Sequence, residues 1–331
     1  AKAISSFEEI DASGAFKRKA SGIRLWVSTD GSTEFPAEPD RYNLIISLAC
    51  PWACRTLAFL KMKGLDDIIK VTVVKPVWEA TRPEVEGDDH RGWVFVTDDS
   101  DAVPGATTDM VFGAKTLRDV YERLETTVGK PTTPLLVDLK AMRAVNNESS
   151  EICRMFNDSF NEFAKHPELN FRPPELVDQI DAFNDKIYET VNNGVYKCGF
   201  AQTQAAYDAA IKVLFDTLDE LDELFGRQRF ACGGVLTEAD IRLWVTLARF
   251  DEVYVVHFKT NKRLIREYPN LSGYTQDVFQ TPGVADSLDL YHVREHYYRS
   301  HPKVNPFGVV PIGSNTLEWL GGEHGRAAKF A

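Results

Sequence analysis

The sequence predicts two domains, an α/β domain with a mixed sheet followed by an all-helical domain. Residues 42–74 alternate strand, helix and strand, and two strands and a helix that begins near Glu148 follow from residue 133. Beyond residue 173, apolar residues instead recur at spacings of three and four, which is the period of an α-helix. A chain of 331 residues is long enough for two such domains.

Composition and charge exclude several kinds of partner. The chain has 38 Lys and Arg against 49 Asp and Glu, a net charge of −11, with no basic stripe. We therefore expect neither nucleic acid nor a membrane as a partner, and an anionic substrate would need local positive charge at its site. Five scattered cysteines fit a reducing compartment and predict a cytoplasmic location. The chain begins at Ala1, so a removed upstream targeting segment stays open.

The α/β domain is predicted over residues 41–160, after an N-terminal arm over residues 1–40. Its elements in order are a strand at 42–48, a helix at 51–63, a strand at 69–74, an insertion at 75–104, a helix at 108–126, strands at 133–139 and 143–146, and a helix that begins near Glu148. This is the order of the thioredoxin fold. In that fold the proline at the position of Pro134 is cis and presents backbone groups to a peptide-like ligand. Whether the insertion is ordered stays open.

The all-helical domain is predicted over residues 173–300, and residues 301–331 form a tail rich in Pro and Gly. Apolar residues from Tyr207 to Phe225 recur on one helical face, which Gly226 ends. Thr237 and Asp240 have the spacing of a capping box at the start of the next helix.

Cys50 is the candidate nucleophile. It follows an apolar strand and precedes Pro51, which suits the first position of a helix. Free backbone N–H groups and the positive end of the helix dipole therefore converge on the sulfur and favour the thiolate, which is the reactive form. This layout is typical of thiol-redox and glutathione-dependent enzymes. The alternative is a buried structural cysteine that merely precedes a helix.

Seven motifs together carry a family resemblance. In chain order they are Cys50-Pro51-Trp52-Ala53, Gly92-Trp93, Asn147–Ile152, Arg249–Tyr254, His257-Phe258-Lys259, Tyr268–Leu271 and His296-Tyr297-Tyr298. Over about residues 18–313 the chain resembles the Xi-class glutathione transferases, also called glutathionyl-hydroquinone reductases. The resemblance implies a glutathione transferase fold, glutathione as co-substrate and no metal.

The resemblance also implies a glutathione site. Cys50 would be the catalytic thiolate, and Glu148 and Ser149 would bind the γ-glutamyl end of glutathione. Without the other motifs, ordinary helix N-terminal chemistry would explain that pair. The backbone of Thr133, beside Pro134, would pair with the cysteinyl part.

Further positions follow from the same resemblance. Trp93 would form one side of the glutathione pocket; the alternative is that it is a tryptophan of the hydrophobic core. Lys130 stands where the family usually has Arg, and it loses the planar two-point grip on a carboxylate. Tyr196 and Tyr297 would act in catalysis and line the substrate pocket; Tyr298 is the alternative to Tyr297 on that face.

Cys54 departs from the family, which usually has His at this position. It lies four residues after Cys50, on the same face of the predicted helix. It is either a small buried residue or a resolving thiol, although helical geometry strains a disulfide at this spacing.

The predicted function is glutathione-dependent reduction of S-glutathionyl-hydroquinones to hydroquinones. The reaction would pass through a mixed disulfide of Cys50 with glutathione and release oxidised glutathione, so the partners are glutathione and glutathionylated aromatic quinols. One alternative is a thioltransferase or dehydroascorbate reductase; another is a non-catalytic ligand-binding module. The resemblance further implies a homodimer through the helical domain, with contacts within residues 175–300.

Overall fold

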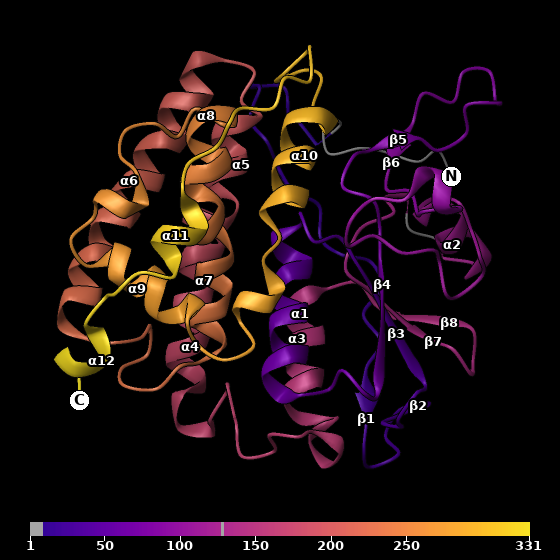
Figure 1. The fold of residues 1–331 in the computed structure, drawn as a ribbon, viewed down its shortest axis with the longest axis horizontal. Coiled ribbons are helices and arrows are strands. Elements are labelled where there is room, and N and C mark those ends of the chain that lie inside the picture. Colours follow the sequence, from indigo (N-terminus) through magenta and orange to yellow (C-terminus); the bar gives the residue numbers. More distant parts are fainter. Residues whose placement is uncertain (1–8, 127–128) are drawn as a thin grey trace. The chain divides into compact units, whose positions relative to one another are not determined.

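The computed structural model describes residues 9–126 and 129–331 (Figure 1). Contacts divide the chain into two compact units. Unit 1 contains Ala20–Leu169 and Asp286–Ser300, and unit 2 contains Glu9–Lys19, Asn170–Ala285 and His301–Ala331. The units do not follow the predicted domain limits throughout, because Asp286–Ser300 belongs with the α/β unit. Cys50 and Tyr297 therefore share unit 1.

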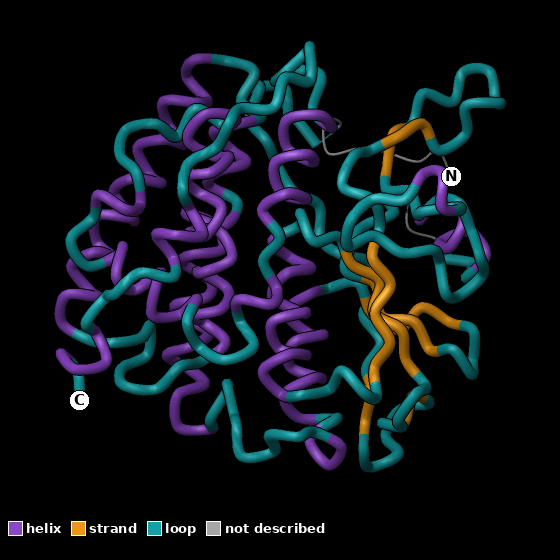
Figure 2. The backbone as a smooth tube through the Cα atoms, viewed as in Figure 1, coloured by secondary structure: helices purple, strands orange, loops and turns teal. Residues whose placement is uncertain are grey.

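Unit 1 is built on a four-stranded sheet with the order β4-β3-β7-β8. The strands are β3 (Tyr42–Ile46), β4 (Ile69–Val73), β7 (Leu135–Asp138) and β8 (Arg143–Asn146). β3 and β4 are parallel, whereas β7 is antiparallel to β3 and β8 is antiparallel to β7. This mixed sheet, drawn in orange in Figure 2, confirms the predicted thioredoxin-like order.

Helices cover both faces of this sheet (Figure 1). On one side α1 (Pro51–Lys63) packs against α3 (Ser149–Asp158). On the other, α2 (Leu117–Arg123) contributes Leu117 and Val120 to a core that includes Ile45 and Val137. Pro51 opens α1 and Gly64 ends it in a left-handed conformation, as predicted, with its N–H bonded to the carbonyls of the last turn.

The start of α2 was predicted wrongly. We expected a helix from residue 108, but it begins at Leu117, where Thr116 is the N-cap. The carboxylate of Asp109 instead accepts hydrogen bonds from the backbone N–H groups of Val111, Phe112 and Ala114. Such local bonds offer the backbone an alternative to the helix.

The N-terminal arm protects the edge strand β8. Leu25 N donates to Val145 O at 2.9 Å, and Asn147 N donates to Ile23 O at 3.0 Å. The arm then forms a two-stranded parallel sheet from β1 (Val27–Ser28) and β2 (Phe35–Pro36). A covered edge is unavailable for pairing with another chain.

The insertion at 75–104 is ordered. It contains the antiparallel strands β5 (Glu79–Ala80) and β6 (Arg91–Gly92) and a 3-10 turn, η2 (Asp99–Asp101). Arg118 of α2 is buried and fixes the insertion by donating to Thr81 Oγ1 at 3.2 Å and to Asp88 Oδ1 at 2.9 Å.

Unit 2 is helical, as predicted. Its α-helices are α4 (Val177–Ile187), α5 (Gly194–Gly199), α6 (Gln204–Arg227), α7 (Glu238–Arg249), α8 (Val255–His257), α9 (Leu271–Phe279), α11 (Thr316–Leu320) and α12 (Arg326–Lys329). Two π-helical turns, η5 (Tyr188–Asn192) and η6 (Phe250–Tyr254), interrupt this pattern. Short 3-10 turns are η3 (Asn161–Phe163) in unit 1, η4 (Pro174–Leu176) and η7 (Ile265–Glu267) in unit 2, and η8 (Ala285–Ser287), where the two units meet in sequence.

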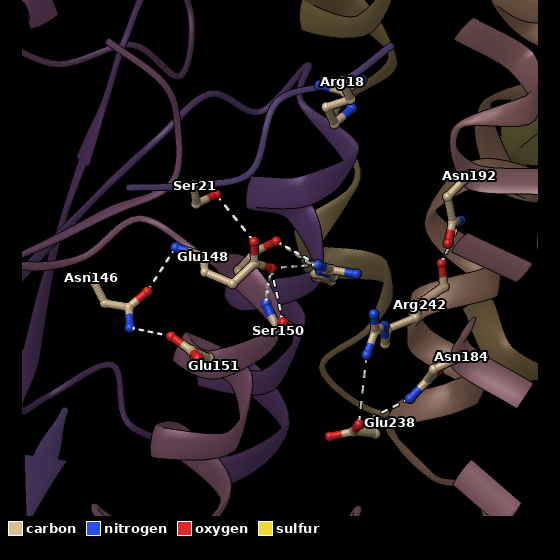
Figure 3. A network of polar contacts seen from close by, with 12 residues as sticks. Arg18, Ser21, Asn146, Glu148, Ser150, Glu151, Asn184, Asn192, Glu238 and Arg242 are labelled. Carbon is tan, nitrogen blue, oxygen red and sulfur yellow. Dashed lines mark hydrogen bonds and ion pairs between the residues drawn. The ribbon is translucent and has the colours of Figure 1, made fainter. Parts of the chain in front are cut away.

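The predicted capping box of α7 is confirmed. Asp240 is fully buried and accepts hydrogen bonds from the N–H of Thr237 at 2.9 Å, the N–H of Ala231 at 2.7 Å and the hydroxyl of Tyr274 at 2.9 Å. Nearby, Glu238 accepts from Asn184 Nδ2 at 3.0 Å (Figure 3). The predicted tail is also packed: Arg326 donates to the carbonyls of Phe225 and Gln228.

None of the helices in the described part of the chain is long and apolar enough to cross a membrane.

Two of the family motifs lie in the interior of unit 2. Phe250, Val253 and Tyr254 are completely buried, and His257 is 4% exposed. The ring nitrogens His257 Nε2 and His301 Nδ1 lie 2.9 Å apart, so one of them donates and the other accepts. Burial, together with the charge of Lys259, lowers the pKa of His257 to about 3.

Because of this buried histidine pair, we expect the free energy of unfolding to decrease in acid. The folded-state pKa of about 3 lies below the unfolded value, so between pH 6.5 and 3 the unfolded chain binds the extra proton, and stability falls as pH falls. Between pH 7 and pH 5 we expect His257→Gln to lose about 2 kcal/mol less unfolding free energy than the wild type, by urea titration. His166→Gln, at an exposed site in unit 1, is the control and should follow the wild type. Parallel curves for all three proteins would contradict the assignment.

Candidate functional site

Cys50 lies where the sequence predicts it, at the N-cap of α1. Its φ and ψ of −77° and 119° are extended, and its carbonyl accepts the N–H of Cys54 at 2.9 Å to begin the helix. The side chain makes no capping bond and is half-buried. The sulfur lies 3.6 Å from Thr133 O. A sulfur in this position faces the unpaired amides of the first helical turn.

The loop before β7 brings Thr133 to this sulfur. The Thr133–Pro134 peptide bond is cis, as predicted. Tyr121 fixes the preceding residue by donating its hydroxyl to Thr132 O at 2.8 Å, and Asn147 Nδ2 donates to Thr132 Oγ1 at 3.3 Å. Burial raises the pKa of Tyr121, so its hydroxyl remains a neutral donor.

Glu148 and Ser149 lie together at the start of α3. Glu148 is the N-cap, and its carboxylate accepts from Ser150 N at 3.1 Å, Ser150 Oγ at 2.8 Å and Ser21 Oγ at 3.1 Å (Figure 3). Asn146 Oδ1 in turn accepts the N–H of Glu148 at 2.7 Å. Strand β8 and the arm thus hold the carboxylate at the helix terminus.

Arg55 is a member of this cluster that sequence reasoning missed. Its side chain is 1% exposed and donates to Ser149 Oγ from Nε at 2.9 Å and from Nη2 at 2.6 Å. Nη2 also lies 3.4 Å from Glu148 Oε1, and the guanidinium carbon lies 5.1 Å from the ring centre of Trp52. Because the hydroxyl of Ser149 accepts both donors of Arg55, its own proton is directed away from Arg55 and is available to an acceptor.

The electrostatics of the cluster favour ionised Glu148. Burial opposes the charge, but the Arg55 guanidinium and the hydrogen bonds from Ser150 and Ser21 outweigh it and hold the pKa of the carboxyl below its usual range. A carboxylate, a hydroxyl and a helix N-terminus side by side are suited to an ammonium and carboxylate on one carbon, as at the γ-glutamyl end of glutathione.

Trp93 and Lys130 belong to the same unit. Trp93 is 7% exposed, and its ring stacks on His296 with centroids 4.6 Å apart. Lys130 is half-buried and lies three residues before Thr133. Their roles toward glutathione remain predictions.

The three tyrosines fall in different units. Tyr297 and Tyr298 lie on α10 (Leu290–Ser300) in unit 1 and are 1% and 3% exposed. Tyr196 lies on α5 in unit 2, where its ring centre is 5.3 Å from that of Phe258 and 4.8 Å from the guanidinium carbon of Arg18. Which of Tyr297 and Tyr298 faces a substrate therefore remains a prediction.

Cys54 is 1% exposed, and its sulfur lies 3.0 Å from Ser287 O. All five cysteines are free thiols. The thiol of Cys54 is buried and bonded to a carbonyl, which favours the interpretation of Cys54 as a small buried residue over that of a resolving thiol. No group of three or more His, Cys, Asp and Glu side chains that could hold a metal ion occurs in the described residues.

This site and fold define a class: a thioredoxin-like unit with a cysteine at a helix N-terminus, followed in sequence by a helical unit. The glutathione S-transferase N-terminal domain model matches residues 49–159, and the C-terminal domain model matches residues 204–277. Both matches agree with the architecture.

Individual relatives narrow the class. The glutathionyl-hydroquinone reductase YqjG of Escherichia coli K12 is 44% identical over 96% of this chain and 94% of its own, and the reductase PcpF of Sphingobium chlorophenolicum is 42% identical over 91% and 90%. The glutathione-bound structure of YqjG has a TM-score of 0.84 over 93% of this chain and 97% of that one. The glutathione transferase Xi of Phanerochaete chrysosporium, at 44% identity, has a TM-score of 0.83 over 90% and 97%. The chain belongs to the Xi class of glutathione transferases.

Proposed function

We propose that this enzyme reduces S-glutathionyl-hydroquinones to hydroquinones at the expense of glutathione. The observation that carries the proposal is the position of Cys50 at the N-terminus of α1, with its sulfur 3.6 Å from Thr133 O. The relatives that are 42–44% identical bear the name of this activity. The structure of YqjG that contains glutathione supports glutathione as the co-substrate.

In the first step the thiolate of Cys50 attacks the sulfur of the glutathionyl group. A sulfur–sulfur bond forms and the carbon–sulfur bond breaks, so the two sulfurs are oxidised and the carbon takes the electron pair. An aromatic carbon is a poor leaving group, whereas the carbon of a keto tautomer leaves as an enolate. Tyr196 and Tyr297 exchange protons with the oxygen of this enolate and stabilise its negative charge.

In the second step a further glutathione thiolate attacks the mixed disulfide. It displaces Cys50 and leaves as oxidised glutathione, so the course is ping-pong. Cys50 then leaves as a thiolate at a helix N-terminus, where the charge is stabilised. One cysteine is sufficient for this cycle, and the burial of Cys54 agrees with a single-thiol mechanism.

Glutathione binding follows from the cluster around Arg55. The carboxylate of Glu148 receives the ammonium of the γ-glutamyl end, and Ser149 with the first amides of α3 receives its carboxylate. Thr133 pairs through its backbone with the cysteinyl part, Trp93 walls the pocket, and Lys130 meets a carboxylate with a single ammonium.

The runner-up activity is that of a thioltransferase or dehydroascorbate reductase. It would use the same cysteine, but it would need no proton exchange with an enolate oxygen, because its leaving group is not a carbon. The two tyrosines therefore distinguish the activities.

Cys50→Ser should abolish reduction of a glutathionyl-hydroquinone, because a serine hydroxyl is scarcely ionised at neutral pH. We expect less than about 1% of the wild-type turnover with unchanged circular dichroism. Cys54→Ala is the matched control and should keep most activity. Turnover of a tenth of wild type in the serine variant, or an inactive Cys54→Ala, would refute the single-thiol cycle.

The tyrosines should matter for carbon–sulfur cleavage alone. Tyr196→Phe and Tyr297→Phe should each lower kcat for the glutathionyl-hydroquinone by about tenfold or more, with kcat for a simple glutathione mixed disulfide within about twofold. A disulfide has a sulfur leaving group and needs no enolate stabilisation. Tyr291→Phe, on the exposed side of α10, is the control. Equal losses on both substrates would show that the tyrosines only shape the pocket.

We also propose a homodimer, formed through unit 2. Residues 249–254 of the family motifs are buried inside the unit, and so are His257 and Phe258, whereas Lys259 is exposed. A more suitable surface for a dimer contact surrounds a cavity of about 790 Å³ between residues 13–18 and the first half of α6. The wall of this cavity includes Ala205, Ala209 and Val213. Val213 is 47% exposed, so this face leaves apolar area uncovered. A monomer by light scattering at micromolar concentration would contradict the dimer, and Val213→Glu should weaken it.

A cytoplasmic location completes the proposal. The five free thiols and the demand for reduced glutathione both fit a reducing compartment.

A further inference from the structure

Three buried polar side chains occupy one face of α10. His292, His296 and Ser300 are spaced by four residues, so they lie above one another along the helix. They are 0%, 6% and 3% exposed. Buried polar groups at regular helical spacing need partners, and all three find them in one segment.

That segment is the main chain of the insertion at 75–104. His292 Nε2 lies 2.6 Å from Pro104 O, and His296 Nδ1 lies 2.9 Å from Pro76 O. Ser300 Oγ accepts the N–H of Trp78 at 3.0 Å. A carbonyl can only accept, so both histidines donate from the stated nitrogens. Two bonds lie near the start of the insertion and one near its end.

His296 also makes ring contacts with the insertion. It stacks on Trp93 with an interplanar angle of 27°, and the edge of Trp78 meets it with centroids 5.1 Å apart. The next residue along the helix is Tyr297, whose ring centre lies 5.2 Å from that of His296. The residue that contacts the predicted glutathione wall is thus the neighbour of the predicted proton donor.

The insertion is itself held in place on unit 1. Arg118 of α2 bonds Thr81 and Asp88, and Leu117 N, at the start of α2, donates to Trp93 O at 3.0 Å. Just before α10, Ser287 accepts the thiol of Cys54 from α1, the helix that begins at Cys50. The segment that carries Tyr297 is therefore attached to the nucleophile's own unit at both ends.

We propose that His296, supported by His292 and Ser300, is a positioning residue that sets the axial register of α10 and thereby places Tyr297 for proton exchange with the enolate oxygen of the leaving group. The proposal rests on the proposed function, because it acts through the role of Tyr297. The proposal also assigns a function to the insertion at 75–104. Its backbone groups would determine the position of α10 along the helix axis.

The axial position of a helix determines where its side chains lie. Slipping a helix by one residue moves it about 1.5 Å and turns its side chains by about 100°. The two carbonyls and one N–H group of an anchored segment cannot follow such a slip, so three bonds along one face select one register. A misplacement of about 1 Å at a reacting group can cost about 100-fold in rate. Attack of Cys50 on a disulfide needs no tyrosine and should not depend on the register.

The test compares two substituents at position 296. His296→Leu removes the donor, whereas His296→Asn can return a donor close to the position of Nδ1. For the glutathionyl-hydroquinone, Leu should lower kcat about tenfold with KM within about twofold, and Asn should recover most of the loss. Turnover of a simple glutathione mixed disulfide should stay within about twofold for both. His166→Gln serves as the control for loss of a histidine in unit 1.

A double-mutant comparison isolates the route of action. If His296 acts through Tyr297, then His296→Leu should cost nothing further in a Tyr297→Phe background. Additive losses, equal losses on both substrates, or no loss in His296→Leu would each overturn the proposal. Ser300→Ala, which removes no buried ring, keeps the test available if His296→Leu does not fold; it should lower thioether turnover selectively, by about threefold, and an unselective effect would count against the proposal.

The same measurements separate this proposal from the function on which it rests. A Tyr297→Phe variant without substrate selectivity would reject the proton-exchange step itself. A selective Tyr297→Phe together with an unselective His296→Leu would reject only the positioning role.

Discussion

The buried guanidinium of Arg55 joins the two helix N-termini on which the site depends. It projects from α1, one turn beyond Cys50, and its bonds end on Ser149 and Glu148 at the start of α3. An unpaired buried charge would cost several kcal/mol, so the two helices are held in one relative position. The proposed nucleophile at the start of α1 and the proposed γ-glutamyl anchor at the start of α3 are therefore held in a fixed relative position. Lys could not replace this fork, since one ammonium cannot present two parallel donors.

Local signals in the sequence predicted those parts of the fold that local chemistry determines. Pro51 and Gly64 bound α1 correctly because a first-turn proline and a left-handed glycine act on their own residues. The strand at Arg143–Asn146 and the capping box of Asp240 were also correct. The start of α2 was predicted wrongly because hydrophobic periodicity does not reveal competing hydrogen bonds. The carboxylate of Asp109 accepts such bonds from nearby backbone N–H groups.

The parts that were missed are those determined by distant residues. Arg55 meets Ser149 across 94 positions, and His296 meets Pro76 across 220. No spacing rule contains such pairs. Helical periodicity gave no signal for Arg55 either, because it lies about 200° round the helix from Ala53 and so opposite the apolar face of Ala53, Leu57 and Leu60. The assignment of α10 to unit 1 had no such signal, because it depends on contacts with the insertion, 188 and 220 positions earlier in the chain.

The charge of the whole chain and the charge of the site have opposite consequences for an anionic substrate. A net charge of −11 repels glutathione, which carries two carboxylates and one ammonium at neutral pH. The site offsets this repulsion with groups that do not alter the net charge much: the amides at the starts of α1 and α3, and a hydroxyl oriented by Arg55. In the proposed binding mode Glu148 adds a negative charge at the one point where glutathione is positive, and its lowered pKa keeps that charge at neutral pH. Salt should therefore weaken the long-range repulsion more than these short, partly buried contacts, because screening acts mainly on exposed charges.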